Sequence, residues 1–310
     1  MPKLETMVVE VSNHGSFPSR ERGLLGAGEI LLGGAPALRF VNFRGCALQA
    51  LCPPLTGVTT LHFHMHRGFQ CTLREFGDLL ERLHSLCDCS LAQCTVRPPD
   101  GSAPDTLIRI PSLQFLTITL EPVSIFQYLS APALRMLAIV GVPKRQVQKF
   151  LESWIRTGLT QYPNLEVLSL TRFEGNEKRD WEQLFERVPT LRRLTMSNEE
   201  RHTGVALAAL AGISTFDLML LPNLEALPTL AVPRDALVEF IMSRCTPIGR
   251  SPFHMMACHP GFVNALERDY GDAIAWMMTK GVVLEGKILN PSDGAWWPAF
   301  VRNWASGPSS

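Results

Sequence analysis

The chain has 310 residues, with 29 basic and 29 acidic side chains and a formal net charge of zero. This balance leaves no whole-chain electrostatic footprint for nucleic acid or for an anionic membrane. No apolar run approaches the roughly 20 residues of a membrane span, and the opening MPKLETMVVEV lacks the charged leader of a signal peptide. We therefore expect a protein of the cytoplasm or nucleus that binds neither nucleic acid nor membranes.

One spacing, Leu-x-x-Leu-x-Leu with apolar replacements, recurs nine times along the chain. The phrases are Leu4 Met7 Val9, Leu38 Val41 Phe43, Val58 Leu61 Phe63, Leu86 Cys89 Leu91, Leu113 Leu116 Ile118, Leu134 Leu137 Ile139, Leu165 Leu168 Leu170, Leu191 Leu194 Met196, and Ile213 Phe216 Leu218. Six phrases have a proline two residues before the first apolar position, namely Pro2, Pro36, Pro111, Pro132, Pro163 and Pro189. The last two apolar positions of a phrase share parity, so each phrase predicts a strand with one face in the core.

The mean interval between phrases is about 26 residues, which is within the range of leucine-rich repeats. This spacing predicts an α/β fold, a leucine-rich repeat solenoid with a curved parallel sheet on the concave face and helices or irregular returns on the convex face. We expect about nine irregular repeats over residues 1–221. A degenerate last repeat and a mainly helical C-terminal cap would follow over residues 222–310, because an uncovered last repeat would show its core to water.

Several of the segments between phrases have helical periodicity. Apolar residues share one helix face in 73–83, in the segment that Pro143 opens, and around Trp181. After Leu221 the pattern degrades, with Pro228 at a position that would need a ladder donor. We expect a helix around Leu237 and Phe240, a loop near Cys258, and a longer helix from Phe262 to Met278. The tail, with Trp296, Trp297, Phe300 and Trp304, would pack as a final apolar lid.

Three stretches look like chemical motifs but have a structural explanation. Cys46 and Cys94 fall where a small residue bonds the repeat turn, Cys89 falls in the core, and no CxxC pair occurs. The glycine-rich segment 23–34 lacks the GK[ST] ending of a phosphate loop. These cysteines fit a reduced compartment.

His62, His64 and His66 alternate along one predicted strand, and an HxH pair on a strand can reach one metal ion. The structural reading is that Phe63 points into the core, so His62 and His64 point to solvent and His66 bonds the turn. The neighbouring repeats offer Arg44 and Ser90, neither of which is a good third ligand. We expect no metal, no cofactor and no catalytic residue.

The outward positions of the phrases define the predicted concave face, where exposed apolar side chains commonly mark a partner site. Its candidate binding residues are Phe40, Arg44, His62, His64, Phe115, Met136, Val140, Val167 and Arg193. The middle of this face is apolar and its ends are basic. We expect Phe115 and Met136 to form its central anchor.

One family resemblance is carried by the segments SAPALRMLAIVGVP (130–143), QVQKFLESWI, YPNLEVLSL, VPTLRRLTM, and LPNLEAL followed by LVEFIMSRC. In these segments the chain resembles the leucine-rich repeat portion of fungal F-box proteins. The resemblance covers most of residues 1–282. It implies intracellular repeats that recruit a target protein, with an N-terminal F-box docking the complex to the adaptor of a cullin-RING ubiquitin ligase. No LPxELL-like opening of an F-box occurs here, so we expect that an upstream region is missing. The ligase adaptor would bind only if that upstream region carries an F-box.

Two functions follow from these patterns. The leading one is a non-catalytic protein-protein recognition module, in the setting of an F-box-type ubiquitin ligase. The alternative is a metal-dependent hydrolase or metal-binding protein that uses His62 and His64, with Cys258 and His259 as further candidates. The sequence identifies neither the protein partner nor the oligomeric state.

Overall fold

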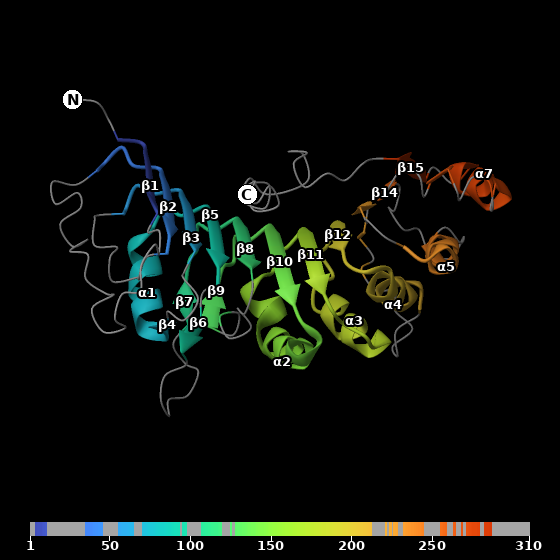
Figure 1. Ribbon diagram of the computed structural model, residues 1–310, viewed down its shortest axis with the longest axis horizontal. Coiled ribbons are helices and arrows are strands. Elements are labelled where there is room, and N and C mark those ends of the chain that lie inside the picture. Colours follow the sequence, from blue (N-terminus) through green and yellow to red (C-terminus); the bar gives the residue numbers. More distant parts are fainter. Residues whose placement is uncertain are drawn as a thin grey trace. The chain divides into compact units, whose positions relative to one another are not determined.

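The computed structural model divides into two compact units, residues 1–135 with 160–162, and residues 136–159 with 163–310 (Figure 1). It describes residues 4–10, 35–45, 55–64, 70–93, 95–97, 107–119, 125, 128–212, 221, 223–224, 226–228, 232–244, 255–258, 263–264, 268, 271–279 and 282–286. Each unit contains a parallel ladder of strands. An α/β fold with a mostly parallel sheet is therefore confirmed.

The ladder of the first unit runs in chain order. Its strands are β1 (Thr6–Glu10), β2 (Phe40–Arg44), β3 (Thr60–His64), β5 (Asp88–Ala92) and β8 (Phe115–Thr119). The register follows the sequence phrases, with Val41 opposite Leu61, Leu61 opposite Cys89, and Cys89 opposite Leu116. The inward side chains of β2, β3, β5 and β8 are at most 3% exposed. These residues form the core that the spacing predicted.

A turn with the same hydrogen bond precedes seven of the described ladder strands. The N–H of Leu38 donates to the carbonyl of Ala35 at 2.9 Å, and Pro36 takes the second position of this turn, which suits its fixed φ. The same bond recurs from Val58 to Leu55, Leu86 to Leu83, Leu113 to Ile110, Leu134 to Ala131, Leu191 to Val188 and Leu224 to Leu221. The accepting residues are all buried. The sequence analysis identified the prolines but missed this additional core position.

The returns of the first unit hold one helix and several short strands. α1 (Leu73–Arg82) begins with a capping box, because Glu75 N–H donates to Thr72 Oγ1 at 3.2 Å and Thr72 N–H donates to Glu75 Oε2 at 2.8 Å. Its apolar face is buried as predicted. The short strands are β4 (Gln70–Thr72) paired with β6 (Thr95–Arg97), and β7 (Ile108–Arg109) paired with β9 (Leu129–Ser130).

The ladder of the second unit extends well beyond residue 221. Its strands are β10 (Met136–Val142), β11 (Val167–Phe173), β12 (Arg193–Ser197), β13 (Ala226–Pro228), β14 (Met255–Cys258) and β15 (Val283–Gly286), all parallel and in chain order. The expected loop near Cys258 is a strand instead. Among the described residues of 222–310, β13 lies where a degenerate last repeat was expected, and β14 and β15 add ladder strands to the expected helices.

Helices lie on one side of the strands in the second unit (Figure 1). They are α2 (Lys144–Gln161), α3 (Lys178–Phe185), α4 (Glu200–Ala211), α5 (Arg234–Arg244) and α7 (Gly271–Thr279). Their core contains a chain of fully buried rings, Phe150, Trp154, Phe173, Trp181 and Phe185, with neighbouring centroids 5.0 to 5.8 Å apart. Ring pairs at this spacing stabilise a core beyond their buried area.

Arg244, at the end of α5, is a buried cation that holds two chain segments together. Its Nη1 donates to the carbonyl of Leu221 at 3.0 Å, and its Nη2 donates to that of Leu210 at 3.2 Å. Leu210 belongs to the last turn of α4, whose carbonyls lack partners within the helix. Burial lowers the Arg244 pKa to about 10. The guanidinium therefore fastens α5 to the end of α4.

Several sequence predictions fall outside the described residues. These are the glycine-rich segment 23–34, Cys46, His66, Cys94, the phrase Ile213, Phe216 and Leu218, His259 and the tryptophan-rich tail. Among the helices of the described part of the chain, none combines the length and apolar character needed to cross a membrane.

Candidate functional site

The outward side chains of each ladder form three rows across the strands. The first row contains Phe40, Thr60, Asp88 and Phe115 in the first unit, and Met136, Val167 and Arg193 in the second. All seven keep solvent exposure, and Phe115 is 41% exposed. We call these residues the accessible row. Six of these seven side chains are large or charged, so a partner can reach anchoring groups along this row.

The second row is buried from β3 onward, in His62, Ser90 and Thr117 of the first unit and in Ala138, Ser169 and Thr195 of the second. In the two strands before β3 it is open, because Asn42 is half-buried and Val8 is 59% exposed. Neighbouring strands of a ladder are about 4.8 Å apart, so short side chains of the same row leave little surface between them. Ser90 is 1% exposed and its Oγ has no hydrogen-bond partner. From β3 onward, this row therefore forms a packed floor rather than a contact surface.

The third row is mixed. Arg44 and His64 are half-buried and still reach solvent, as the sequence analysis expected. Val140 was expected to be exposed but is only 6% exposed. It is a compact β-branched side chain opposite Thr171 in the ladder, so its neighbours cover most of its surface. Val140 is therefore removed from the set of exposed candidates.

His62 also requires a correction, because its side chain is 8% exposed rather than turned to solvent. Its ring contacts the edge of Phe40, with the centroids 5.0 Å apart and an interplanar angle of 79°. Burial, together with the positive charge of Arg44, lowers the His62 pKa to about 4. The imidazole is thus neutral near pH 7. Its place on the outward side of β3 was predicted correctly, but its environment was not.

Asp88 is an acidic residue of the accessible row. It lies between Thr60 and Phe115, so its carboxyl neighbours the exposed aromatic ring. Partial burial raises the pKa of its carboxyl. A partner that brings a cation to this carboxylate would relieve the cost of its desolvation. The sequence analysis did not include Asp88 among the binding candidates.

Within the described residues, no group of three or more His, Cys, Asp and Glu side chains is placed to hold a metal ion. Zinc sites need three or four protein ligands, and His62 and His64 supply two. The side chains of Cys258 and His259 lie outside what the structure describes.

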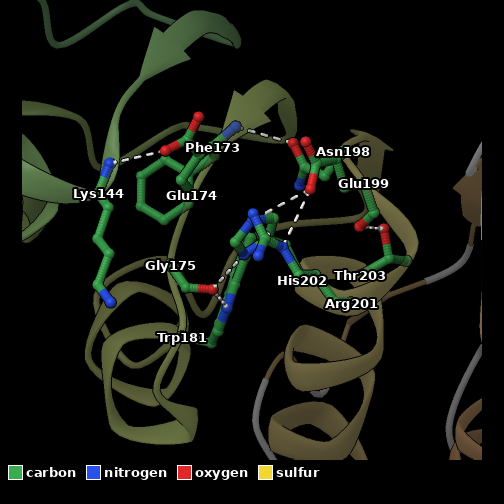
Figure 2. Close-up of polar contacts among 10 residues, drawn as sticks. All are labelled: Lys144, Phe173, Glu174, Gly175, Trp181, Asn198, Glu199, Arg201, His202 and Thr203. Atoms are coloured by element: carbon green, nitrogen blue, oxygen red, sulfur yellow. Dashed lines mark hydrogen bonds and ion pairs between the residues drawn. The ribbon is translucent and has the colours of Figure 1, made fainter.

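A second cluster of polar groups lies at the carboxyl ends of β10, β11 and β12, where α2, α3 and α4 begin (Figure 2). Glu174 Oε2 accepts a hydrogen bond from the first N–H of α2, at Lys144, over 3.0 Å. Asn198 Oδ1 accepts from the N–H of Phe173 over 2.9 Å. These bonds tie successive repeats together at the point where each strand ends.

His202 is the buried centre of this cluster. Its Nε2 lies 3.1 Å from Arg201 Nε, which can only donate, so Nε2 accepts. Its Nδ1 then carries the proton and donates to the carbonyl of Gly175 over 3.1 Å (Figure 2). The same carbonyl accepts from Trp181 Nε1 over 3.2 Å. Both ring nitrogens are therefore engaged, and His202 has a structural role, which the sequence analysis missed because its partners come from other repeats.

The predicted binding residues are thus brought together in two sets. Phe40, Arg44, His64 and Phe115 share a face of the first unit, while Met136, Val167 and Arg193 are ladder neighbours in the second. Phe115 and Met136, the expected central anchor, belong to different units. Their joint anchor therefore stays a prediction.

Comparisons with known proteins add no assignment. No protein-family model matches the chain, and no curated protein is similar to it.

Proposed function

We propose that this protein is a non-catalytic recognition module of the leucine-rich repeat class, whose partner protein docks on the accessible row. The observation that carries this proposal is the contrast between the rows: the amino-terminal outward positions stay accessible in both units, while the adjacent row is buried from β3 onward. A packed floor beside a strip of large side chains suits capture of a protein surface, because binding anchors are large groups held on a rigid support.

The repeated phrases also support a stacked arrangement of the units as a solenoid. Each phrase has one strand, one preceding turn and one set of inward apolar residues, and each repeat can bury its core only against neighbours. In such an arrangement the accessible row would continue from one unit to the next. A partner could then contact Phe115 and Met136 together.

The partner is proposed to be a target of ubiquitination, on the basis of the resemblance to F-box proteins. Recruitment to a cullin-RING ligase would require an F-box supplied with these repeats. Coprecipitation of the ligase adaptor with the protein from its own cells tests this part separately. If the protein coprecipitates with its partner but without the adaptor, the proposed ubiquitination role is wrong and the proposed recognition role is unaffected.

Site-specific photocrosslinking tests the docking face. A photoreactive phenylalanine analogue placed at Phe40, Phe115 or Val167 should give crosslinks to the same partner, because all three belong to the accessible row. The matched controls are Arg82 and Glu152, which are exposed on α1 and α2. Crosslinks that form from Arg82 and Glu152 but not from the accessible row would show that the partner uses the helical side.

Paired substitutions give a second test. Phe115→Asp should keep the fold, because Phe115 is exposed, and should weaken partner binding at least tenfold by placing a charge at an anchor. Leu116→Asp, the neighbouring inward residue, should unfold its repeat because it buries an unpaired carboxylate. Circular dichroism checks the fold and titration calorimetry checks binding. Full affinity in folded Phe115→Asp would contradict the proposed anchor.

A further inference from the structure

Asp88 places a half-buried carboxylate in the accessible row of the first unit. Within the described part of the chain, no group donates a hydrogen bond to this carboxylate or forms an ion pair with it. Burial raises the pKa of the carboxyl, and no positive charge of the described residues offsets that effect. A charged group that has lost part of its water and gained no donor is costly to the folded chain. The cost is recovered when a ligand supplies the donors.

The ring of Phe115 lies beside this carboxylate. Asp88 and Phe115 are register partners in β5 and β8, and neighbouring strands are about 4.8 Å apart. Phe115 is 41% exposed, so a ligand can reach its ring. Thr60 flanks Asp88 from β3 and is also accessible. These three side chains present a negative charge, an aromatic ring and a hydroxyl on one small area.

We propose that the partner protein inserts an arginine side chain against Asp88 and Phe115. This inference rests on the proposed function, because it names the group that the partner places on the accessible row. A guanidinium can donate two parallel hydrogen bonds to a carboxylate and also stack on an aromatic ring. A lysine ammonium is a strongly hydrated point charge and lacks this planar geometry. Arginine therefore satisfies the carboxylate and the ring together.

Phe40 favours a segment of protein over a free guanidinium compound as the ligand. It lies two strands from Asp88 in the same row, about 10 Å away at the ordinary strand spacing. Its ring is half-buried against His62 and still reaches solvent. A partner segment can place an apolar side chain on Phe40 while its arginine contacts Asp88. An isolated guanidinium would contact only one of the two.

Selection from a library of random peptides displayed on phage tests the recognition of arginine. The unmodified chain should enrich peptides that contain arginine, and Asp88→Asn should lose that enrichment while it still selects apolar residues. Asp78→Asn, the same change at an exposed position of α1, is the matched control and should keep the enrichment.

The outcomes separate this inference from the proposed function. Equal enrichment of arginine by the unmodified chain and by Asp88→Asn would overturn the inference and leave the docking face unaffected. Failure to select any peptide, or peptides that bind equally well to Phe40→Ala and Phe115→Ala, would contradict the proposed function as well.

Titration calorimetry with a selected peptide measures the contact itself. Replacing the arginine of the peptide with citrulline, its uncharged analogue, should weaken binding to the unmodified chain at least tenfold. The same replacement should weaken binding to Asp88→Asn far less, because the carboxylate is no longer present. Equal losses on the two chains would show that the arginine binds elsewhere.

Thermal unfolding of the free protein gives a check that needs no ligand. Asp88→Asn should raise the unfolding midpoint at pH 7, because the folded chain no longer holds an unpaired, partly desolvated charge. Asp78→Asn should leave the midpoint nearly unchanged, since its carboxylate is exposed. A lower midpoint for Asp88→Asn would show that the carboxylate stabilises the fold, and would overturn the inference.

Discussion

His62 occupies an outward strand position and is nevertheless buried, with its ring against Phe40. Side-chain alternation along a strand determines which face a residue occupies, but neighbouring side chains determine how much water reaches it. The same distinction explains Val140, which is small and covered, and Phe115, which is large and exposed. At the scale of single residues, parity predicted the face that each residue occupies, but it did not predict the burial of His62 and Val140.

The protonation of His62 should make the fold sensitive to acid. Its pKa is lowered from 6.5 to about 4 in the folded protein, so the unfolded chain binds the proton more tightly. The stability that this neutral histidine contributes is present above pH 6.5 and is lost as the pH falls from about 6.5 to about 4. We expect a loss of about 1 to 2 kcal/mol from this residue after allowance for solvent screening. Urea unfolding at several pH values measures it.

A non-titrating variant isolates this effect. His62→Gln should have a flatter dependence of unfolding free energy on pH between 6.5 and 4 than the unmodified protein, whatever its stability at pH 7. Thr60→Ser, two residues away and without a titratable group, is the control and should keep the slope of the unmodified protein. Identical slopes for the unmodified protein and His62→Gln would show that His62 does not contribute.

The recurring element is a turn followed by a strand, rather than a strand alone. A buried residue accepts the turn hydrogen bond, proline commonly follows it, and the first apolar residue of the phrase donates. The sequence pattern revealed the proline because its identity repeats. The buried acceptor varies among Ala, Leu, Ile and Val, and for this reason it was missed.

This turn predicts a stabilising substitution at Thr56. Thr56 follows the buried acceptor Leu55 and is exposed, in the place that Pro36 and Pro111 take in other repeats. Thr56→Pro should raise the unfolding free energy by about 0.4 to 1 kcal/mol, because proline restricts the unfolded chain at a compatible position. Thermal unfolding checks the change.

The contrast is His84→Pro in the turn that follows α1. Leu83, which would precede the new proline, is the C-cap of α1 and has ψ of 56°. A residue before proline prefers an extended ψ of about 120 to 160°, so this substitution should destabilise the protein. Similar effects of Thr56→Pro and His84→Pro would mean that the turn does not govern the outcome.

Among the described helices, α4 was missed, whereas α1, α2, α3 and α5 were predicted and α7 overlaps the longer helix expected from Phe262 to Met278. Glu200–Ala211 is rich in alanine and lacks a clear apolar stripe, since buried residues include His202 and Thr203 as well as Leu207. The helices α1, α2 and α3 carry large apolar residues at helical spacing, which is the signal that periodicity detects. Small residues pack α4 closely but leave that signal weak.

For the whole molecule, the section after residue 221 continues the ladder of the second unit. β13 pairs with β12, and Leu224, Leu237 and Phe240 are fully buried. A chain that ends at Leu221 should therefore lose several large buried side chains, each contributing about 1.5 to 3 kcal/mol, and should aggregate or unfold at lower temperature. Size-exclusion chromatography with thermal unfolding measures this. A monomer with unchanged thermal unfolding would show that residues 222–310 form a separate body.

Much of the ladder could be read from the sequence because leucine-rich phrases repeat a local rule. The inward residues of β2, β3, β5 and β8, and of β10, β11 and β12, were all identified by spacing. β13 was expected only as a degenerate repeat, because Pro228 interrupts its leucine phrase, and β14 and β15 were not identified, because their segments carry no such phrase. Their pairing depends on backbone hydrogen bonds to neighbouring strands, which side-chain patterns do not report.

The candidate site divides in the same way. The sequence by itself determined which residues face outward, the rows they share and the absence of a recognisable catalytic motif, because strand parity and repeat spacing are local properties. Only the tertiary structure decided that the first row is accessible, that His62 and Val140 are covered, and that His202 bonds to Gly175. Exposure and hydrogen bonding depend on residues of other repeats, which lie about 20 to 30 positions away in the chain. Gly175 and His202, for example, are separated by 27 positions.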